Sequence, residues 1–93
     1  MNAYKLTATG AGNTDALRYA IRDTDGTSIL PLQAHVEGDA TFNINGRVSG
    51  EAPWLPLKED ATADFLESFS YIPHLQLEIT AGSGTVTLWI GDK

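Results

Sequence analysis

Apolar and polar residues alternate with a period of two along most of this chain, and helical periodicity is nearly absent. In the clearest example, Leu75, Leu77 and Ile79 alternate with polar neighbours. Successive side chains of a β-strand point to opposite faces, so this pattern is typical of a strand with one buried face. The alternation therefore predicts an all-β chain.

A second alternating segment follows almost at once. Val86, Leu88 and Ile90 share one parity, and the small, glycine-rich stretch 81–84 separates them from the first segment. Two half-buried strands joined by a short loop are typical of a β-hairpin. We therefore expect residues 75–90 to form a hairpin.

Further strand patterns occupy the rest of the chain, near residues 4–8, 17–22, 30–36, 42–48 and 54–57. Pro31 falls within one of them. Because proline cannot donate to a strand ladder, we expect that strand to lie at a sheet margin. The Asn45-Gly46 pair is compatible with a two-residue turn. A bulge within one long strand is preferred, because Gly46 keeps the parity of Ile44.

One segment departs from the β pattern. Residues 61–68 are compatible with a short helix, because Phe65 and Phe69 are spaced four apart and would share one side of it. We therefore expect a short helical or irregular segment around 61–70.

The number and spacing of the strands predict the architecture. Six to eight short strands at intervals of roughly ten residues favour an antiparallel β-sandwich or jelly roll. We expect residues 1–93 to form a single domain of this kind. Residues 1–12 are a candidate for a flexible or strand-exchanging arm, because Gly10 and Gly12 follow the first strand.

The charge balance and the lack of cysteine restrict partners and stabilising devices. Twelve acidic residues against six basic ones give a net charge of -6, which disfavours nucleic acid and anionic membranes as partners. With no cysteine, neither disulfides nor thiolate zinc sites can stabilise so small a domain. Oligomerisation remains, so a trimer or dimer is expected.

The sequence also bears on the compartment. No signal peptide follows Met1, and no stretch approaches the roughly 20 apolar residues of a transmembrane helix. We expect a protein made in a cytoplasm.

Residue types capable of catalysis occur without a supporting motif. Asp64, Ser68, Ser70 and His74 have the chemistry of a small hydrolase, but no nucleophile elbow accompanies them. The stretch 23–27 begins like a calcium loop but departs from its spacing, and its Asp-Gly pair favours a turn. We therefore predict no catalytic, metal or cofactor site and no enzymatic activity.

Four side chains remain as candidates for an interface: Trp54, Tyr71, Trp89 and His35. Trp89 has outward parity on the last strand. His35 has the parity opposite to its apolar neighbours, so we expect it to face solvent or a subunit partner. An exposed tryptophan can stack on a sugar ring or anchor a protein interface. For Trp54, packing in the core is the alternative.

Four motifs occupy the second half of the chain: Ala40–Gly50, Pro53–Leu57, Ile72–Thr80 and Gly82–Ile90. Over residues 38–91, this order of strands and turns resembles the small β-sandwich virion proteins of tailed bacteriophages. Members of that group decorate or cement capsids, or occupy tail and neck positions.

The resemblance implies a non-enzymatic structural protein that binds and stabilises a capsid lattice as a decoration or cement subunit. Its partners would be copies of itself and the major capsid protein or other virion proteins. Its location would be the capsid surface, after synthesis in a bacterial cytoplasm. The alternative is a carbohydrate- or receptor-binding β-module at a phage tail or neck, using Trp54, Tyr71 and Trp89. No cofactor is implied.

Overall fold

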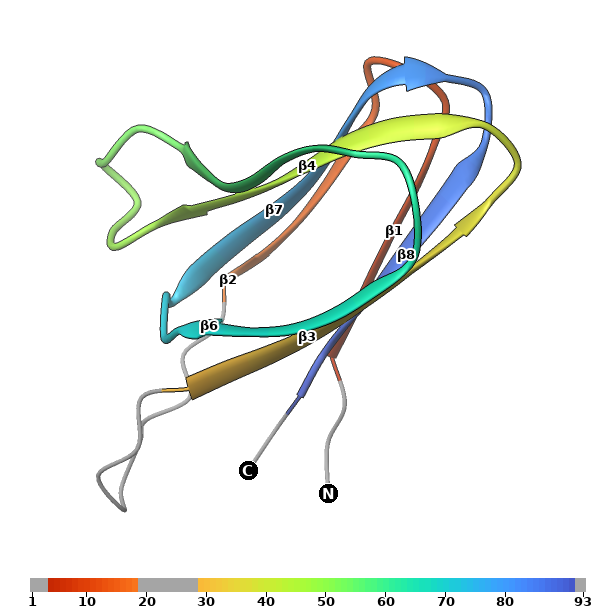
Figure 1. Ribbon diagram of the computed structural model, residues 1–93. Helices are drawn as coiled ribbons and strands as arrows, with labels where there is room; N and C mark the ends of the chain where they lie inside the picture. The colour runs from red at the N-terminus through yellow and green to blue at the C-terminus, as the bar shows by residue number, and fades with distance from the viewer. Residues whose placement is uncertain (1–3, 19–28, 92–93) are drawn as a thin grey trace.

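The computed structural model describes residues 4–18 and 29–91 as two antiparallel four-stranded sheets packed face to face (Figure 1). One sheet, called sheet A, has the order β1-β8-β3-β6, and the other, sheet B, has the order β2-β7-β4-β5. The strands are β1 (Tyr4–Thr9), β2 (Thr14–Arg18), β3 (Ile29–Glu37), β4 (Ala40–Arg47), β5 (Leu55–Ala61), β6 (Phe65–Ser70), β7 (His74–Gly82) and β8 (Thr85–Ile90). The predicted all-β sandwich is confirmed.

The two strand orders match position by position. Where sheet A has β1, β8, β3 and β6, sheet B has β2, β7, β4 and β5, so each position holds two strands consecutive in the chain. The hydrogen-bonded pairs include β1 with β8, β2 with β7, β3 with β6 and β4 with β5. This pairing is that of a jelly roll.

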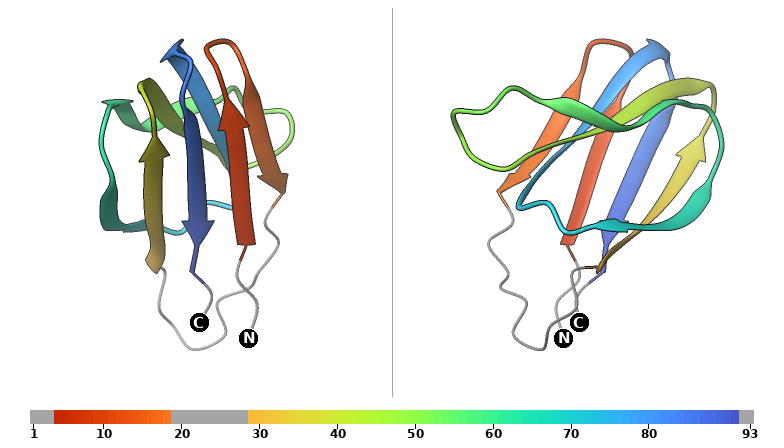
Figure 2. Two further views of the ribbon diagram at one scale, coloured as in Figure 1. Left: turned by 90° about the vertical axis from the view of Figure 1, so that its right-hand side faces the viewer. Right: turned by 60° about the vertical axis from the view of Figure 1, so that its left-hand side comes forward.

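Among the described links that carry the chain from one sheet to the other, four lie at the same end of the sandwich, and we call them the arch links: residues 10–13, 38–39, 62–64 and 83–84. They lie along one end of the sandwich (Figures 1 and 2). Gly10 N donates to Gly84 O at 3.0 Å, and Gly84 N donates to Asp39 O at 2.8 Å. Three of the arch links are thus hydrogen-bonded side by side.

Glycine permits this close stacking. Gly82 has a φ of 92°, and a Cβ on it would lie only 2.2 Å from Asp39 O. Few side chains tolerate that backbone conformation, and none fits that distance. The sandwich therefore closes at this end through backbone contacts between arches.

The core lies between the sheets and follows the predicted parity. Leu75, Leu77, Val86, Leu88 and Ile90 are all fully buried. The remaining buried apolar residues are Leu6, Ala8, Leu30, Leu32, Ala34, Ala40, Phe42, Ile44, Ala61 and Ile79. Both sheets therefore contribute one alternating face to a single core.

The expected hairpin over residues 75–90 is wrong. β7 pairs with β2 and β4 in sheet B, whereas β8 pairs with β1 and β3 in sheet A. The two strands bury their apolar faces from opposite sides of the same core. Alternation predicts which face of a strand is buried, but it does not say which strand lies beside it.

The expected helical or irregular segment around 61–70 is also wrong. Residues from Phe65 to Ser70 form β6, which pairs with β3 along its whole length. Phe65 and Phe69 are half-buried against the core, whereas Leu66 is exposed. Two residues spaced four apart share one side of a helix and also one face of a strand. The spacing of Phe65 and Phe69 therefore could not distinguish a helix from a strand.

Pro31 does not mark a sheet margin as expected, because β3 lies between β8 and β6. The ladder with β8 begins at Leu32, and Pro31 O accepts from Gly91 N at 2.8 Å, beyond the end of β8. The nitrogen and the carbonyl of a strand residue point to the same side. The missing N–H therefore falls where the ladder has ended.

The expected continuity through Asn45 and Gly46 is confirmed, because both lie within β4. The register of β4 with β5 shifts on either side of Ile44, and that with β7 shifts between Thr41 and Phe42. The shift between Ile44 and Asn45 adjoins the expected bulge, and the other two lie earlier in the strand.

Residues 4–12 pair within the subunit, because β1 joins β8, and Ala11 N and Gly12 N donate to Gly82 O and Ile79 O. Exchange of a 1–12 arm between copies stays a prediction. The expected strand beyond Arg18 and the 23–27 turn lie outside the described residues. In the described part of the chain, no helix could cross a membrane.

Candidate functional site

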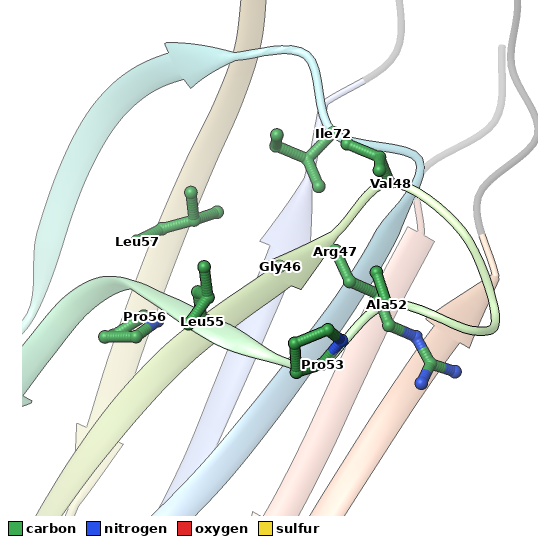
Figure 3. A pocket seen from close by; sticks show the side chains of 9 residues that line it. All are labelled: Gly46, Arg47, Val48, Ala52, Pro53, Leu55, Pro56, Leu57 and Ile72. Atoms are coloured by element: carbon green, nitrogen blue, oxygen red, sulfur yellow. The ribbon is translucent and has the colours of Figure 1, made fainter.

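An apolar groove opens at the end of the sandwich opposite the arch links (Figure 3). It has a volume of about 300 Å³ and an almost entirely apolar lining. Its walls are formed by Gly46, Arg47, Val48, Ala52, Pro53, Leu55, Pro56, Leu57 and Ile72. At its rim, 70% of Val48 and 65% of Leu55 are exposed.

At the groove, one inward-facing position of β4 lacks a side chain, and Ile72 and Leu57 occupy the space above it. Gly46 has the parity of the buried Phe42 and Ile44, yet it contributes only backbone. A Cβ there would lie 2.9 Å from Ile72 Cγ2 and 3.3 Å from Leu57 Cδ1. The alternation continues to Val48, beyond the end of β4, where nothing covers it. The groove is thus an open end of the hydrophobic core.

Arg47 lies on the other side of β4, and its side chain points away from the apolar groove (Figure 3). Its guanidinium carbon lies 4.1 Å from the centroid of the Trp54 ring. Its Nε donates to His74 Nδ1 at 3.3 Å. These two contacts hold the guanidinium in one orientation.

Arg47, Trp54 and His74 line a second cavity of about 190 Å³, together with Ala16 and Leu17 of β2. We call it the arginine pocket. It combines polar and apolar walls, and it lies on the outer face of sheet B.

A network of polar side chains continues from the arginine pocket across sheet B. Asn45 is only 6% exposed, and its Nδ2 donates to Gln76 Oε1 at 2.8 Å and to Glu78 Oε1 at 3.1 Å. Asn43 Nδ2 donates to the same Glu78 oxygen at 3.4 Å. We call these four residues the amide ladder. Because Asn45 is buried and its amide nitrogen donates to both Gln76 and Glu78, it fixes how these two side chains present their other atoms.

The three aromatic candidates do not form one surface. Trp54 is half-buried at the arginine pocket, and Tyr71 is half-buried against the core. Trp89 lies in sheet A, where 37% of it is exposed between its strand neighbours Lys5 and Gln33. A platform that uses all three rings is therefore not formed in this chain.

His35 is exposed, as its parity predicts, and it bonds to an arch link. Its Nδ1 lies 2.9 Å from Asp64 Oδ2, and Asp64 Oδ1 accepts from Val36 N at 2.8 Å. The hydrogen bond to Asp64 raises the pKa of His35 above its ordinary value. The same bond lowers the pKa of Asp64. The pair ties the 62–64 link to β3.

The residue types that suggested a hydrolase are divided between the sheets. Ser68 and Ser70 lie on β6 of sheet A, and Asp64 bonds to His35 of the same sheet. His74, in contrast, lies on sheet B, where its Nδ1 accepts from Arg47 Nε. Asp64 and His74, the acid and the histidine of the suggested hydrolase, are thus not brought together. Among the described residues, no three His, Asp or Glu side chains are grouped to hold a metal ion.

Sequence reasoning singled out Trp54 but missed Arg47, which lies against its ring, and Asn45 of the amide ladder. Their parity, opposite to that of Ile44, was the available signal. Comparisons with protein-family models, with curated proteins and with solved structures find no match to this chain.

Proposed function

We propose that this protein is a non-enzymatic structural subunit of a phage virion that binds a capsid lattice through its apolar groove. The observation that carries the proposal is the exposed rim of that groove, where Val48 and Leu55 leave most of their surface in water. Large apolar residues gathered at a hollow are typical of protein contact sites. The resemblance of residues 38–91 to small virion proteins supports the choice of partner.

The fold gives weaker support. Jelly rolls occur in viral capsid proteins, but also in lectins and cupins. A fold by itself does not define a function. The proposal therefore rests on the groove, and the fold is an analogy consistent with it.

The expected energy of one contact is modest. Complete burial of a valine or leucine side chain contributes about 1.5–3 kcal/mol, so the two rim residues would supply a few kcal/mol at most. Many contacts on one lattice, or several in one oligomer, turn such an interaction into stable attachment. A small subunit whose single contact is weak therefore binds a lattice more tightly when it is multivalent.

Co-sedimentation with capsids tests the proposal. The full chain is mixed with particles assembled from the major capsid protein of the same genome, and the pelleted fraction is measured. We expect Val48→Ser with Leu55→Ser to abolish binding. The matched control is Ile29→Ser with Leu66→Ser, which removes two exposed apolar residues from sheet A and should bind normally. Equal binding of both double variants, or none by the natural chain, would refute the proposal.

The oligomeric part is tested separately by light scattering. We expect the mass of a trimer or dimer at micromolar concentration. A monomer throughout the concentration range would contradict it.

A further inference from the structure

We propose that the arginine pocket and the amide ladder bind an acidic saccharide, with the sugar carboxylate on Arg47 and the ring hydroxyls over the ladder. The site lies on the outer face of sheet B, whereas the apolar groove opens on the other side of β4. The inference therefore does not depend on the proposed attachment to a capsid.

In the part of the chain that the structure describes, no carboxylate forms an ion pair with Arg47, although the chain has twelve acidic residues. Its Nε is used by His74 and its plane lies against Trp54. In the described part of the chain, its terminal nitrogens have no hydrogen-bond acceptor, so they present an oriented pair of donors. Such a fork matches the two oxygens of a carboxylate.

The charge of the protein selects a carboxylate over a phosphate. The net charge of -6 repels anions, and it repels a doubly charged phosphate about twice as strongly as a carboxylate at the same distance. Among the described side chains that line the pocket, Arg47 is the only arginine or lysine. One arginine suits a ligand with one negative charge.

The surroundings of Arg47 select a sugar. Trp54 and Ala16 offer apolar surface to a ring. Gln76 accepts from Asn45 through Oε1, so its amide nitrogen is turned away from Asn45 and serves as a donor. Glu78, two residues further along β7, supplies an acceptor. Hydroxyls both donate and accept, so neighbouring donors and acceptors suit a polyhydroxylated ligand.

A peptide with a free C-terminus also carries a carboxylate, but this surface offers it little else. Extended peptides commonly bind by adding a strand to a free sheet edge. Here β7 and β4 are paired on each side, and the free edge of β2 points away from β7 and from the pocket. A compact ring lying on side chains fits this surface better.

Nuclear magnetic resonance of the full ¹⁵N-labelled chain tests the site. The probes are digalacturonate, the neutral disaccharide of the same linkage, and an N-acetylated dipeptide with a free carboxylate. The Arg47 Nε–H and the Trp54 indole N–H report binding, and the Trp89 indole on sheet A is the internal control. We expect digalacturonate to give saturable shifts of both reporters, with at least tenfold weaker binding of the other two probes.

Substitutions locate the carboxylate. Arg47→Gln should weaken digalacturonate binding at least tenfold, and Arg47→Lys should weaken it less, because lysine keeps the charge but loses the fork. Lys5→Gln makes the same charge change on sheet A and should bind like the natural chain. If Arg47→Gln does not fold, by loss of spectral dispersion, Arg47→Lys carries the comparison.

Four results would overturn the inference: no saturable shift with digalacturonate, equal binding of the neutral disaccharide, tighter binding of the dipeptide, or unchanged binding in the folded arginine variants. None of them depends on capsid co-sedimentation, so the two proposals fail independently.

Discussion

Replacing Gly82 by alanine tests whether the stacked arch links hold the sandwich closed. A Cβ at this position would lie 2.2 Å from Asp39 O and 2.8 Å from Asp39 C, both in the neighbouring arch. Real Cβ atoms do not approach closer than about 3.0 Å, so the two arches must separate. Gly12 is the matched control, because its φ of 88° is similar and nothing lies within 4 Å of its added Cβ.

The two substitutions share one cost and differ in another. The backbone strain of alanine in the left-handed region destabilises the folded state by about 1–2 kcal/mol. Alanine also restricts the unfolded chain more than glycine does, which offsets about 0.4–1 kcal/mol of that loss. Gly12→Ala should therefore lower the free energy of unfolding by about 1 kcal/mol. Gly82→Ala adds the displacement of rigid backbone, for which overpacking costs of about 1–3 kcal/mol are typical. We expect a total loss of about 2–4 kcal/mol, a large share of the 5–15 kcal/mol that stabilises a typical domain.

Urea unfolding followed by far-ultraviolet circular dichroism measures both losses. The comparison requires equal m values, so that only stability has changed. Equal losses for the two variants would show that the contact between arches contributes nothing, and the reasoning would fail.

Three further predictions concern the core, the amide ladder and the arch-link histidine. Phe42→Ala should lower the free energy of unfolding by about 3–5 kcal/mol in urea, because the side chain is fully buried; a loss below 1 kcal/mol would contradict its place in the core. Asn45→Asp places a carboxylate beside Glu78, so its loss of stability should be larger at pH 7 than at pH 4, and a loss independent of pH would refute this. The stabilisation from His35 is complete below its ordinary pKa of 6.5 and is lost as pH rises through its raised folded value. That from Asp64 is complete above its ordinary 3.8 and is lost as pH falls through its lowered folded value. The difference in Tm between the natural chain and His35→Gln should therefore be largest between pH 3.8 and 6.5, and a constant difference from pH 3 to 9 would refute the pairing.

Burial was predictable from the sequence because it is a local property of a strand. The parity of Leu75, Leu77, Leu88 and Ile90 identified the core face, and each of these side chains is fully buried. Pairing is not local. A strand with one apolar face buries it equally well from either sheet, so alternation in 75–90 could not show that β7 and β8 separate.

The candidate site was only partly predictable for the same reason. Trp54 could be singled out as an aromatic residue beside a turn. The pocket beside it, however, is lined by Arg47 of β4 and His74 of β7, which are opposite each other only in one register. A shift of one residue would place Arg47 on the core face instead. The register, set over the whole sheet, creates the arginine pocket.

The nested pairing of the strands sets an order for folding. The pair β4·β5 is enclosed by β3·β6, which is enclosed by β2·β7 and then by β1·β8. In the described part of the chain, only β4 and β5 are both consecutive and paired. Closing a loop costs entropy that grows with its length, so each inner pair shortens the loop that the next pair must close.

Folding should therefore begin around residues 48–54 and end when β1 joins β8. Substitutions near that turn should slow folding, whereas those in β1 should mainly speed unfolding. The segment that forms the apolar groove would then also be the nucleus of the fold. Sequence change there would then be constrained twice, by the proposed recognition and by the rate at which the native chain forms.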